Sequence, residues 1–331
     1  MTTSLTRVPT QPGQRFSLPG ITAADAARVV AAIAAERAPS TLILYASAWR
    51  MFTKWCATRG LVAFPADPAT VCAYLAERAE QGLSIGTINV ACAAIGYEHQ
   101  RAGLPDPITD AMVGRVRRGL RRIVGVAPRR QARPLVGEEV RQIVARIDPG
   151  TAAGARDRAL ILIGFASALR RSELAALTLA DVEFRLGGVV LTVRRSKADQ
   201  DGEGQIVAVA AGEHTSTDPV AALRTWIAAR GTRPGRVFTR MRYPDHTTTD
   251  PIGGHTVARI IRTRAEAAGI PGERVTGHSL RAGHATTAAL AGAPLDRIAA
   301  QTRHRDVSTL VEHYIRPIDA LANTSSRALG L

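Results

Sequence analysis

The sequence is poor in cysteine and has no long apolar run. Its three cysteines, Cys56, Cys72 and Cys92, are too few for a disulfide framework. No stretch approaches the ~18 uninterrupted apolar residues of a membrane span, and the first 20 residues lack the apolar core of a secretion signal. These absences predict a protein of a reducing cytosol with no membrane segment.

Lysine is almost absent, although the chain is strongly basic. Of the 43 basic residues, 41 are arginine and only Lys54 and Lys197 are lysine; with 28 acidic residues the formal charge is +15. This excess of positive charge indicates a polyanionic partner, either nucleic acid or an anionic membrane surface. Because arginine does not give up a proton, a lysine kept in such a sequence is a candidate for proton transfer.

The composition, 46% hydrophobic and 21% charged, is that of a globular protein, and at ~150 residues per domain the length predicts two domains. We expect a flexible arm over 1–20, a helical domain over 21–125, a basic linker over 126–135 and a second domain over 136–331. The second domain is predicted to be mostly helical around a small antiparallel sheet. Its strands are expected at 182–184, 189–193 and 206–210.

A run of arginines without any acid spans the end of the first domain and the linker. In its helical part, Val116, Leu120 and Ile123 form an apolar stripe that leaves the arginines on the other faces. Such runs are ordinarily solvated faces, but charges of one sign repel each other, so a phosphate backbone is the better partner. The candidate DNA-binding residues are Arg115, Arg117, Arg118, Arg121, Arg122, Arg129, Arg130 and Arg133.

Four short stretches of the second domain carry residues suited to phosphoryl transfer. They combine cations, a general base and a hydroxyl nucleophile, a set that needs no metal or other cofactor. The histidine intervals do not match the i, i+4 spacing of metal ligands. The residues are Arg170 in a turn, Lys197 between two strands, His278 and Arg281 one helical turn apart, His304 after Arg303, and Tyr314 ten residues later.

Each of these residues also has a purely structural explanation. Arg170 could be the ion-pair partner of Glu173, Asp157 or Asp181, because a buried charge needs a partner. Lys197 could be a solvated charge in an exposed turn, and the histidines could be ordinary core residues. The interpretation as a catalytic site therefore depends on the four stretches occurring together.

The four stretches resemble, in order, the motifs of the tyrosine recombinase (phage integrase) family. ALRRSEL resembles its first-arginine box, SKADQDGEG its β-hairpin lysine, HSLRAGHAT its His-x-x-Arg box, and RHRDVSTLVEHYIR its last histidine and nucleophilic tyrosine. Residues 40–125 resemble the core-binding domain of the family and 132–331 its catalytic domain. The resemblance implies a mainly α fold with a small antiparallel β-sheet, in which a helical core-binding domain precedes a mixed α+β catalytic domain.

The resemblance also implies a role for each candidate residue. Tyr314 would attack a DNA phosphate, leaving a 3′-phosphotyrosyl link and a free 5′-hydroxyl. Arg170 and Arg281 would hold the non-bridging oxygens and neutralise the charge of the transition state. His278 would exchange a proton with the nucleophile. His304 would donate a hydrogen bond to the phosphate, and Lys197 would protonate the departing 5′-oxygen.

Double-stranded DNA is the implied partner, bound by a homotetramer on paired sites that exchanges C-terminal segments such as 318–331. The implied location is the bacterial cytoplasm, at the nucleoid. Two alternatives share part of this evidence. A type IB-like topoisomerase uses the same chemistry on any supercoiled duplex, and a DNA-binding protein could carry a decayed catalytic domain.

The sequence departs from the family pattern at two places. Arg303 stands where the family usually has glycine before the last histidine, and the interval from His304 to Tyr314 is one residue longer than usual. An added residue turns a helical side chain by about 100° unless a loop absorbs it. Tyr314 nevertheless remains the predicted nucleophile, because no other tyrosine follows Tyr243.

Overall fold

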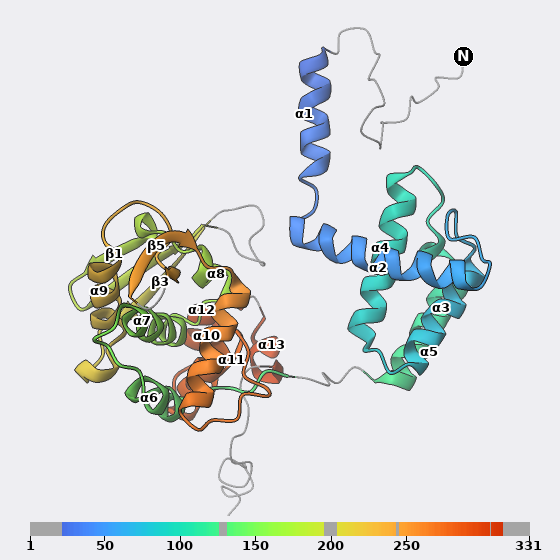
Figure 1. Cartoon of the computed structure of the whole chain (residues 1–331). Coiled ribbons are helices and arrows are strands. Elements are labelled where there is room, and N and C mark those ends of the chain that lie inside the picture. The colour runs from blue at the N-terminus through green and yellow to red at the C-terminus, as the bar shows by residue number, and fades with distance from the viewer. Residues whose placement is uncertain (1–21, 126–130, 195–203, 243–244, 305, 314–331) are drawn as a thin grey trace, which may run out of the picture. The chain divides into compact units, whose positions relative to one another are not determined.

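The computed structural model describes residues 22–125, 131–194, 204–242, 245–304 and 306–313 (Figure 1). The chain divides into two compact units, Met1–Arg129 and Arg130–Leu331, each with its own hydrophobic core. Most described residues are helical and the strands form small antiparallel sheets, which confirms the predicted fold class. No single described helix is long and apolar enough to cross a membrane; one pair bent by 72°, Ala23–Ala34 with Pro39–Thr58, meets the length and composition test jointly.

The described part of the first unit is helical, as predicted. Its centre contains the fully buried side chains of Tyr74, Phe52 and Ile95. The ring centroids of Phe52 and Tyr74 lie 5.1 Å apart. Ser84 starts the fourth helix by accepting a hydrogen bond from the amide of Thr87 at 3.2 Å, a typical N-cap. The helices are α1 (Ala23–Ala34), α2 (Pro39–Thr58), α3 (Pro68–Glu80), α4 (Ile85–Arg101) and α5 (Ala111–Val124).

The apolar face of α5 differs from the prediction at one end. Val113 and Leu120 are buried and Val116 packs against the same core, but Ile123 is 80% exposed. Ile123 lies in the last turn, next to Gly125 where the helix ends, and none of the described residues covers it. Ile123 of the predicted apolar stripe is therefore not part of the buried face of α5.

The second unit places helices around a three-stranded antiparallel sheet. Its register pairs Val189 with Val209 and Leu191 with Val207, and all four side chains are buried in the core. The three predicted strands are confirmed, as β1 (Val182–Arg185), β2 (Gly188–Val193) and β3 (Gln205–Ala210). A further hairpin, which the sequence pattern does not predict, consists of β4 (Thr239–Arg242) and β5 (His246–Pro251).

Eight described helices surround this sheet. The central α7 packs against α9 and α11, and Trp226 of α9 is fully buried. The smaller core under α12 and α13 contains Ile298 and Leu310. The helices are α6 (Gly137–Ala145), α7 (Ala152–Ala166), α8 (Arg171–Ala176), α9 (Pro219–Arg230), α10 (Gly254–Ala267), α11 (Ser279–Leu290), α12 (Leu295–Thr302) and α13 (Val307–His313).

The segment that enters the second unit lies directly against α11. The amide of Leu135 donates to the carbonyl of Ser279 at 3.0 Å, and the amide of Arg133 donates to the carbonyl of Arg274 at 2.9 Å. A Cβ atom at Gly283 would lie 1.7 Å from the carbonyl oxygen of Leu135, so only glycine permits this approach. The segment is thereby fixed beside the helix that carries Arg281.

Candidate active site

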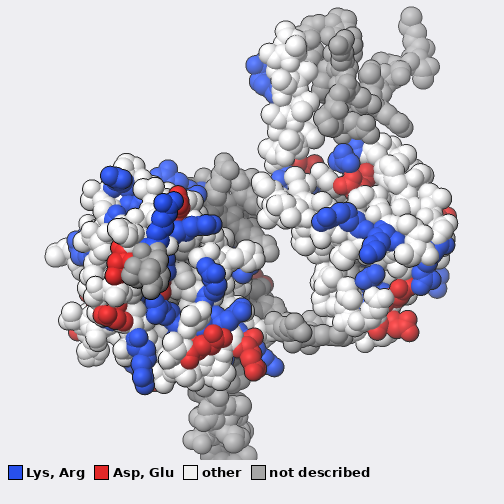
Figure 2. All heavy atoms as spheres, in the orientation of Figure 1, with Lys and Arg blue, Asp and Glu red and all other residues white. Residues whose placement is uncertain are grey.

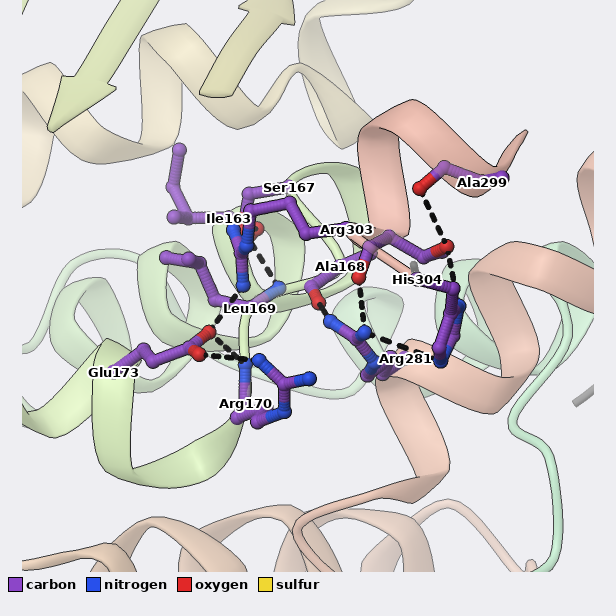
Figure 3. Close-up of polar contacts among 11 residues, drawn as sticks. Ile163, Ser167, Ala168, Leu169, Arg170, Glu173, Arg281, Ala299, Arg303 and His304 are labelled. Carbon is purple, nitrogen blue, oxygen red and sulfur yellow. Dashed lines mark hydrogen bonds and ion pairs between the residues drawn. The ribbon is translucent and has the colours of Figure 1, made fainter. Parts of the chain in front are cut away.

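Three of the six predicted catalytic residues meet at one place in the second unit (Figure 3). Arg170 immediately precedes α8, Arg281 lies in the first turn of α11, and His304 follows α12. His278 caps α11 three residues before Arg281 and has an exposed side chain. Lys197 and Tyr314 lie outside the described residues; Lys197 belongs to the connection from β2 to β3, and Tyr314 directly follows α13.

Arg170 is held by the carboxylate of Glu173. Its Nη1 donates to Oε1 of Glu173 at 2.7 Å, and its backbone amide donates to Oε2 at 2.8 Å, which is half of a capping box at the start of α8. The side chain of Glu173 is only 2% exposed and that of Arg170 is 16% exposed. Of the three acids considered as partners, Glu173 is therefore the one that pairs with Arg170. The other two, Asp157 and Asp181, pair with other arginines.

Arg281 is completely buried and donates to the backbone around it. Its Nη1 donates to the carbonyl of Ala168 at 2.7 Å, and its Nη2 donates to the carbonyl of Thr302 and lies 3.3 Å from Nε2 of His304. Ala168 has φ +51°, a left-handed backbone that residues other than glycine seldom adopt. The backbone of the loop before Arg170 is thus strained at the point where it holds Arg281.

The hydrogen bonds of His304 define its tautomer. Arginine only donates, so Nε2 accepts from Arg281 and the proton lies on Nδ1. Nδ1 then donates to Oγ1 of Thr302 at 2.7 Å, and this hydroxyl donates to the carbonyl of Ile298 at 2.6 Å. Burial, followed by the charges of Arg281, Arg170 and Arg303, lowers the pKa of His304 to about 4. His304 is therefore neutral at pH 7.

Arg303 belongs to the same cluster, although in the sequence it stands out only as a departure from the family pattern. It ends α12 with φ +54° and donates from Nη2 to Oε2 of Glu173, so Arg170 and Arg303 approach the two carboxylate oxygens from different sides (Figure 3). Its side chain is 5% exposed, and burial lowers the pKa of its guanidinium. Its Nε and Nη1 are buried with no hydrogen-bond partner among the described residues.

The arginines of α5 form the second candidate surface. Arg115, Arg118, Arg121 and Arg122 are exposed, whereas Arg117 is partly buried and donates to Oδ1 of Asn89 at 3.3 Å. Within the described part of the chain, none of the five forms an ion pair. Basic side chains also predominate over acidic ones on the visible face of both units (Figure 2).

The helical repeat divides these arginines between two faces. At ~100° per residue, Arg115, Arg118 and Arg122 fall within about 60° of each other, on the side of α5 opposite the buried Val113 and Leu120. We call these three residues the arginine stripe. Arg117 and Arg121 lie nearer the buried face.

The three linker arginines fall into two groups. Arg129 and Arg130 lie outside the described residues. Arg133 forms an ion pair with Glu139 in the first turn of α6. The charge of Arg133 is therefore already compensated, unlike the charges of the arginine stripe.

The other histidine near the cluster has a packing role. The ring centroids of His284, on α11, and Phe165 lie 6.1 Å apart in an edge-to-face arrangement. Burial lowers the pKa of His284. Within the described ranges, no group of three or more His, Cys, Asp or Glu side chains could hold a metal ion.

Comparison with known proteins gives matches over most of the chain. The model of the phage integrase family matches residues 133–320. An integrase/recombinase of Selenomonas ruminantium, named as a XerD homologue, is 31% identical over 283 residues, which cover 85% of this chain and 82% of that protein. A tyrosine recombinase of Synechocystis is 26% identical over 268 residues, covering 77% and 78% of the two chains.

Two solved structures of similar fold are recombinase–DNA complexes. A lambda integrase tetramer bound to a Holliday junction is 18% identical, with a TM-score of 0.59 and coverage of 89% of this chain and 78% of that one. The XerH site-specific recombinase bound to its palindromic difH substrate, after cleavage, is 17% identical, with a TM-score of 0.59 and coverage of 84% and 75%. These two likenesses show the fold.

Proposed function

This chain belongs to the phage integrase family of tyrosine recombinases, and on that premise we propose that it recombines DNA through a covalent bond between Tyr314 and a scissile phosphate. The hydroxyl oxygen of Tyr314 attacks the phosphorus, and the bond to the 5′-oxygen breaks. His278 takes the proton of the tyrosine, and Lys197 gives a proton to the departing oxygen. The 5′-hydroxyl of a second strand reverses the step, so the bond energy is kept and no nucleotide cofactor is consumed.

The convergence of Arg170, Arg281 and a neutral His304 supports this proposal most. Two guanidinium groups can hold the non-bridging oxygens and stabilise the charge that develops as the phosphorus becomes pentacoordinate. Because Arg281 has no exposed surface, DNA binding has to uncover it before it reaches a phosphate. His304 also has to release Arg281 or change tautomer, because its Nε2 must carry a proton to donate to a phosphate oxygen.

Residues 21–125 are proposed to be the core-binding domain and 136–331 the catalytic domain, joined by the linker 126–135. The arginine stripe then contacts the phosphate backbone of double-stranded DNA and supplies affinity without choosing a sequence. We expect a homotetramer on two paired sites, acting on the nucleoid in a bacterial cytoplasm. Family membership favours this function over both alternatives, the topoisomerase and the decayed DNA-binding protein.

A trapping experiment tests the function and finds the DNA site together. The protein is incubated with nicked duplexes of randomised sequence, in which the short strand beyond the cleaved phosphate diffuses away and leaves the covalent adduct. We expect adducts that survive denaturation, a shared sequence in the trapped DNA, and attachment at Tyr314 by peptide mapping. Tyr314→Phe should still bind DNA and trap none.

Three other outcomes would change the proposed function or its nucleophile. Adducts without a shared sequence would indicate the topoisomerase. Binding without any adduct would indicate the decayed DNA-binding protein. Attachment at Ser308 or Tyr243 would move the nucleophile.

A further inference from the structure

Arg303 occupies a position that is unfavourable for an arginine in two independent ways. Its φ of +54° is a left-handed backbone that glycine adopts freely and arginine does not. Its guanidinium is also buried, with two nitrogens lacking hydrogen-bond partners among the described residues. Departures from local rules of this kind are concentrated at functional sites.

Among the described residues, this guanidinium pairs with Glu173, and Glu173 is also the partner of Arg170. The two arginines use different oxygens, Arg303 from Nη2 to Oε2 and Arg170 from Nη1 to Oε1. Glu173 is 2% exposed, so water compensates little of its charge. A single buried carboxylate therefore divides its negative charge between two guanidinium groups.

The shared carboxylate sets the net charge of the cluster. In the cluster of Arg170, Arg281, Arg303, Glu173 and the neutral His304, three positive charges face one negative charge, which leaves two positive charges. A phosphodiester carries one negative charge, and the pentacoordinate transition state carries a second. With glycine at 303, Glu173 would cancel Arg170 alone and leave one positive charge in the cluster.

We propose that Arg303 is a positioning residue that takes up the charge of Glu173, so that Arg170 keeps its own charge for the scissile phosphate. This inference rests on the proposed function. Arg303 acts through Glu173 and Arg170 and does not itself contact the phosphate. The proposed role depends on the charge of Arg303 and not on a bidentate geometry, because Nη2 is the guanidinium nitrogen that bonds to Glu173 among the described residues.

The test measures the rate of adduct formation on the duplex that the wild type traps, with protein in excess over DNA. Arg303→Gly and Arg303→Asn remove the charge, and both residues accept the left-handed backbone. Each should form the adduct ~10–100-fold more slowly, because the transition state loses the electrostatic stabilisation of one positive charge. Duplex affinity, followed by fluorescence anisotropy, should stay within ~2-fold, because one buried charge is a small part of the phosphate contacts. Arg303→Lys keeps the charge, so its rate of adduct formation should fall by less than ~5-fold, since an ammonium also pairs with a carboxylate.

Two further comparisons separate charge balance from a structural role. In Arg303→Gly with Glu173→Gln, the competing carboxylate is gone, so adduct formation should recover most of the loss. On a duplex whose scissile phosphate has a methyl group in place of one non-bridging oxygen, the transition state has one negative charge fewer. The difference between the wild type and Arg303→Gly should shrink there to ~3-fold or less, because one positive charge then suffices.

Three results for the rate of adduct formation would overturn the inference. Arg303→Gly and Arg303→Asn variants that trap DNA at the wild-type rate would show that the charge at 303 is not used. A double variant no faster than Arg303→Gly alone, or an equal defect on the methylated duplex, would show that Arg303 does not act by offsetting the charge of Glu173. A wild type that traps no DNA would instead refute the proposed function, and this inference with it.

Discussion

The arginine stripe on α5 gives a quantitative prediction about how the chain holds DNA. From Arg115 to Arg122 the helix rises about 10 Å, at 1.5 Å per residue. At one phosphate per ~1.7 Å of duplex axis, this length faces about six phosphates, of which about three lie on the near side. Changing Arg115, Arg118 and Arg122 to glutamine should therefore remove about three phosphate contacts. The slope of log K against log salt should flatten by about 2.7.

Fluorescence anisotropy with a labelled duplex measures this slope. Between 50 and 200 mM salt, the variant should lose about 40-fold less affinity than the wild type loses, on a trapped site and on random duplex alike. The control variant also loses three positive charges, but from exposed arginines that already pair with a neighbouring acid, so its slope should be unchanged. Its substitutions to glutamine are at Arg101, Arg141 and Arg185.

Two results would refute this reasoning. An equal flattening in the control variant would show that net charge sets the slope, wherever the charge lies. A variant that keeps its affinity for random duplex while losing one site would show that the stripe reads bases. The second result would also contradict the proposal that α5 supplies affinity without choosing a sequence.

Three further predictions concern chemistry and stability. Lys197→Arg keeps the charge but gives up no proton, so cleavage should slow by ~10²–10⁴-fold. A substrate with sulfur as the bridging 5′ atom, which leaves without protonation, should restore the rate. Failure of this rescue would show that Lys197 acts by its position or charge and not as the general acid. The pKa of His304 falls from its ordinary 6.5 to about 4, so an unfolded His304 takes up a proton below pH 6.5 while the folded one does not. Urea titrations should show stability falling as the pH drops from 6.5 to 4, by ~1–2 kcal/mol after solvent screening, and falling less in His304→Gln. Gly283→Ala should lower the free energy of unfolding by ~1–3 kcal/mol, because its Cβ would meet the carbonyl of Leu135. Gly119→Ala has open space and should raise that free energy by ~0.5–1 kcal/mol; equal effects of the two changes would contradict the close approach.

The helices and the main sheet could be predicted because local patterns determine them. Ser84 caps α4 through its own side chain, and the alternation of Val189, Leu191 and Val193 marks a strand with one buried face. The β4–β5 hairpin has no such signal, since its second strand, His246–Pro251, is polar and mostly exposed. Ile123 shows the same limit, because periodicity gives the face of a residue but not whether another helix extends far enough to cover it.

The cluster around Glu173 marks the boundary of what the sequence determines. Arg170, Arg281 and His304 could be named from short motifs, because each motif carries its residue at a fixed place in a helix or turn. The link from Arg303 to Glu173 joins residues 130 positions apart and depends on how the end of α12 meets the start of α8. From the sequence alone, Arg303 could be noted only as an arginine in place of a glycine. Its φ of +54° shows that the backbone keeps the conformation suited to glycine while the side chain turns into the core. The substitution thus leaves the local fold in place and changes the charge of the site, which is why the departure at 303 affects the chemistry that we expect more than the architecture.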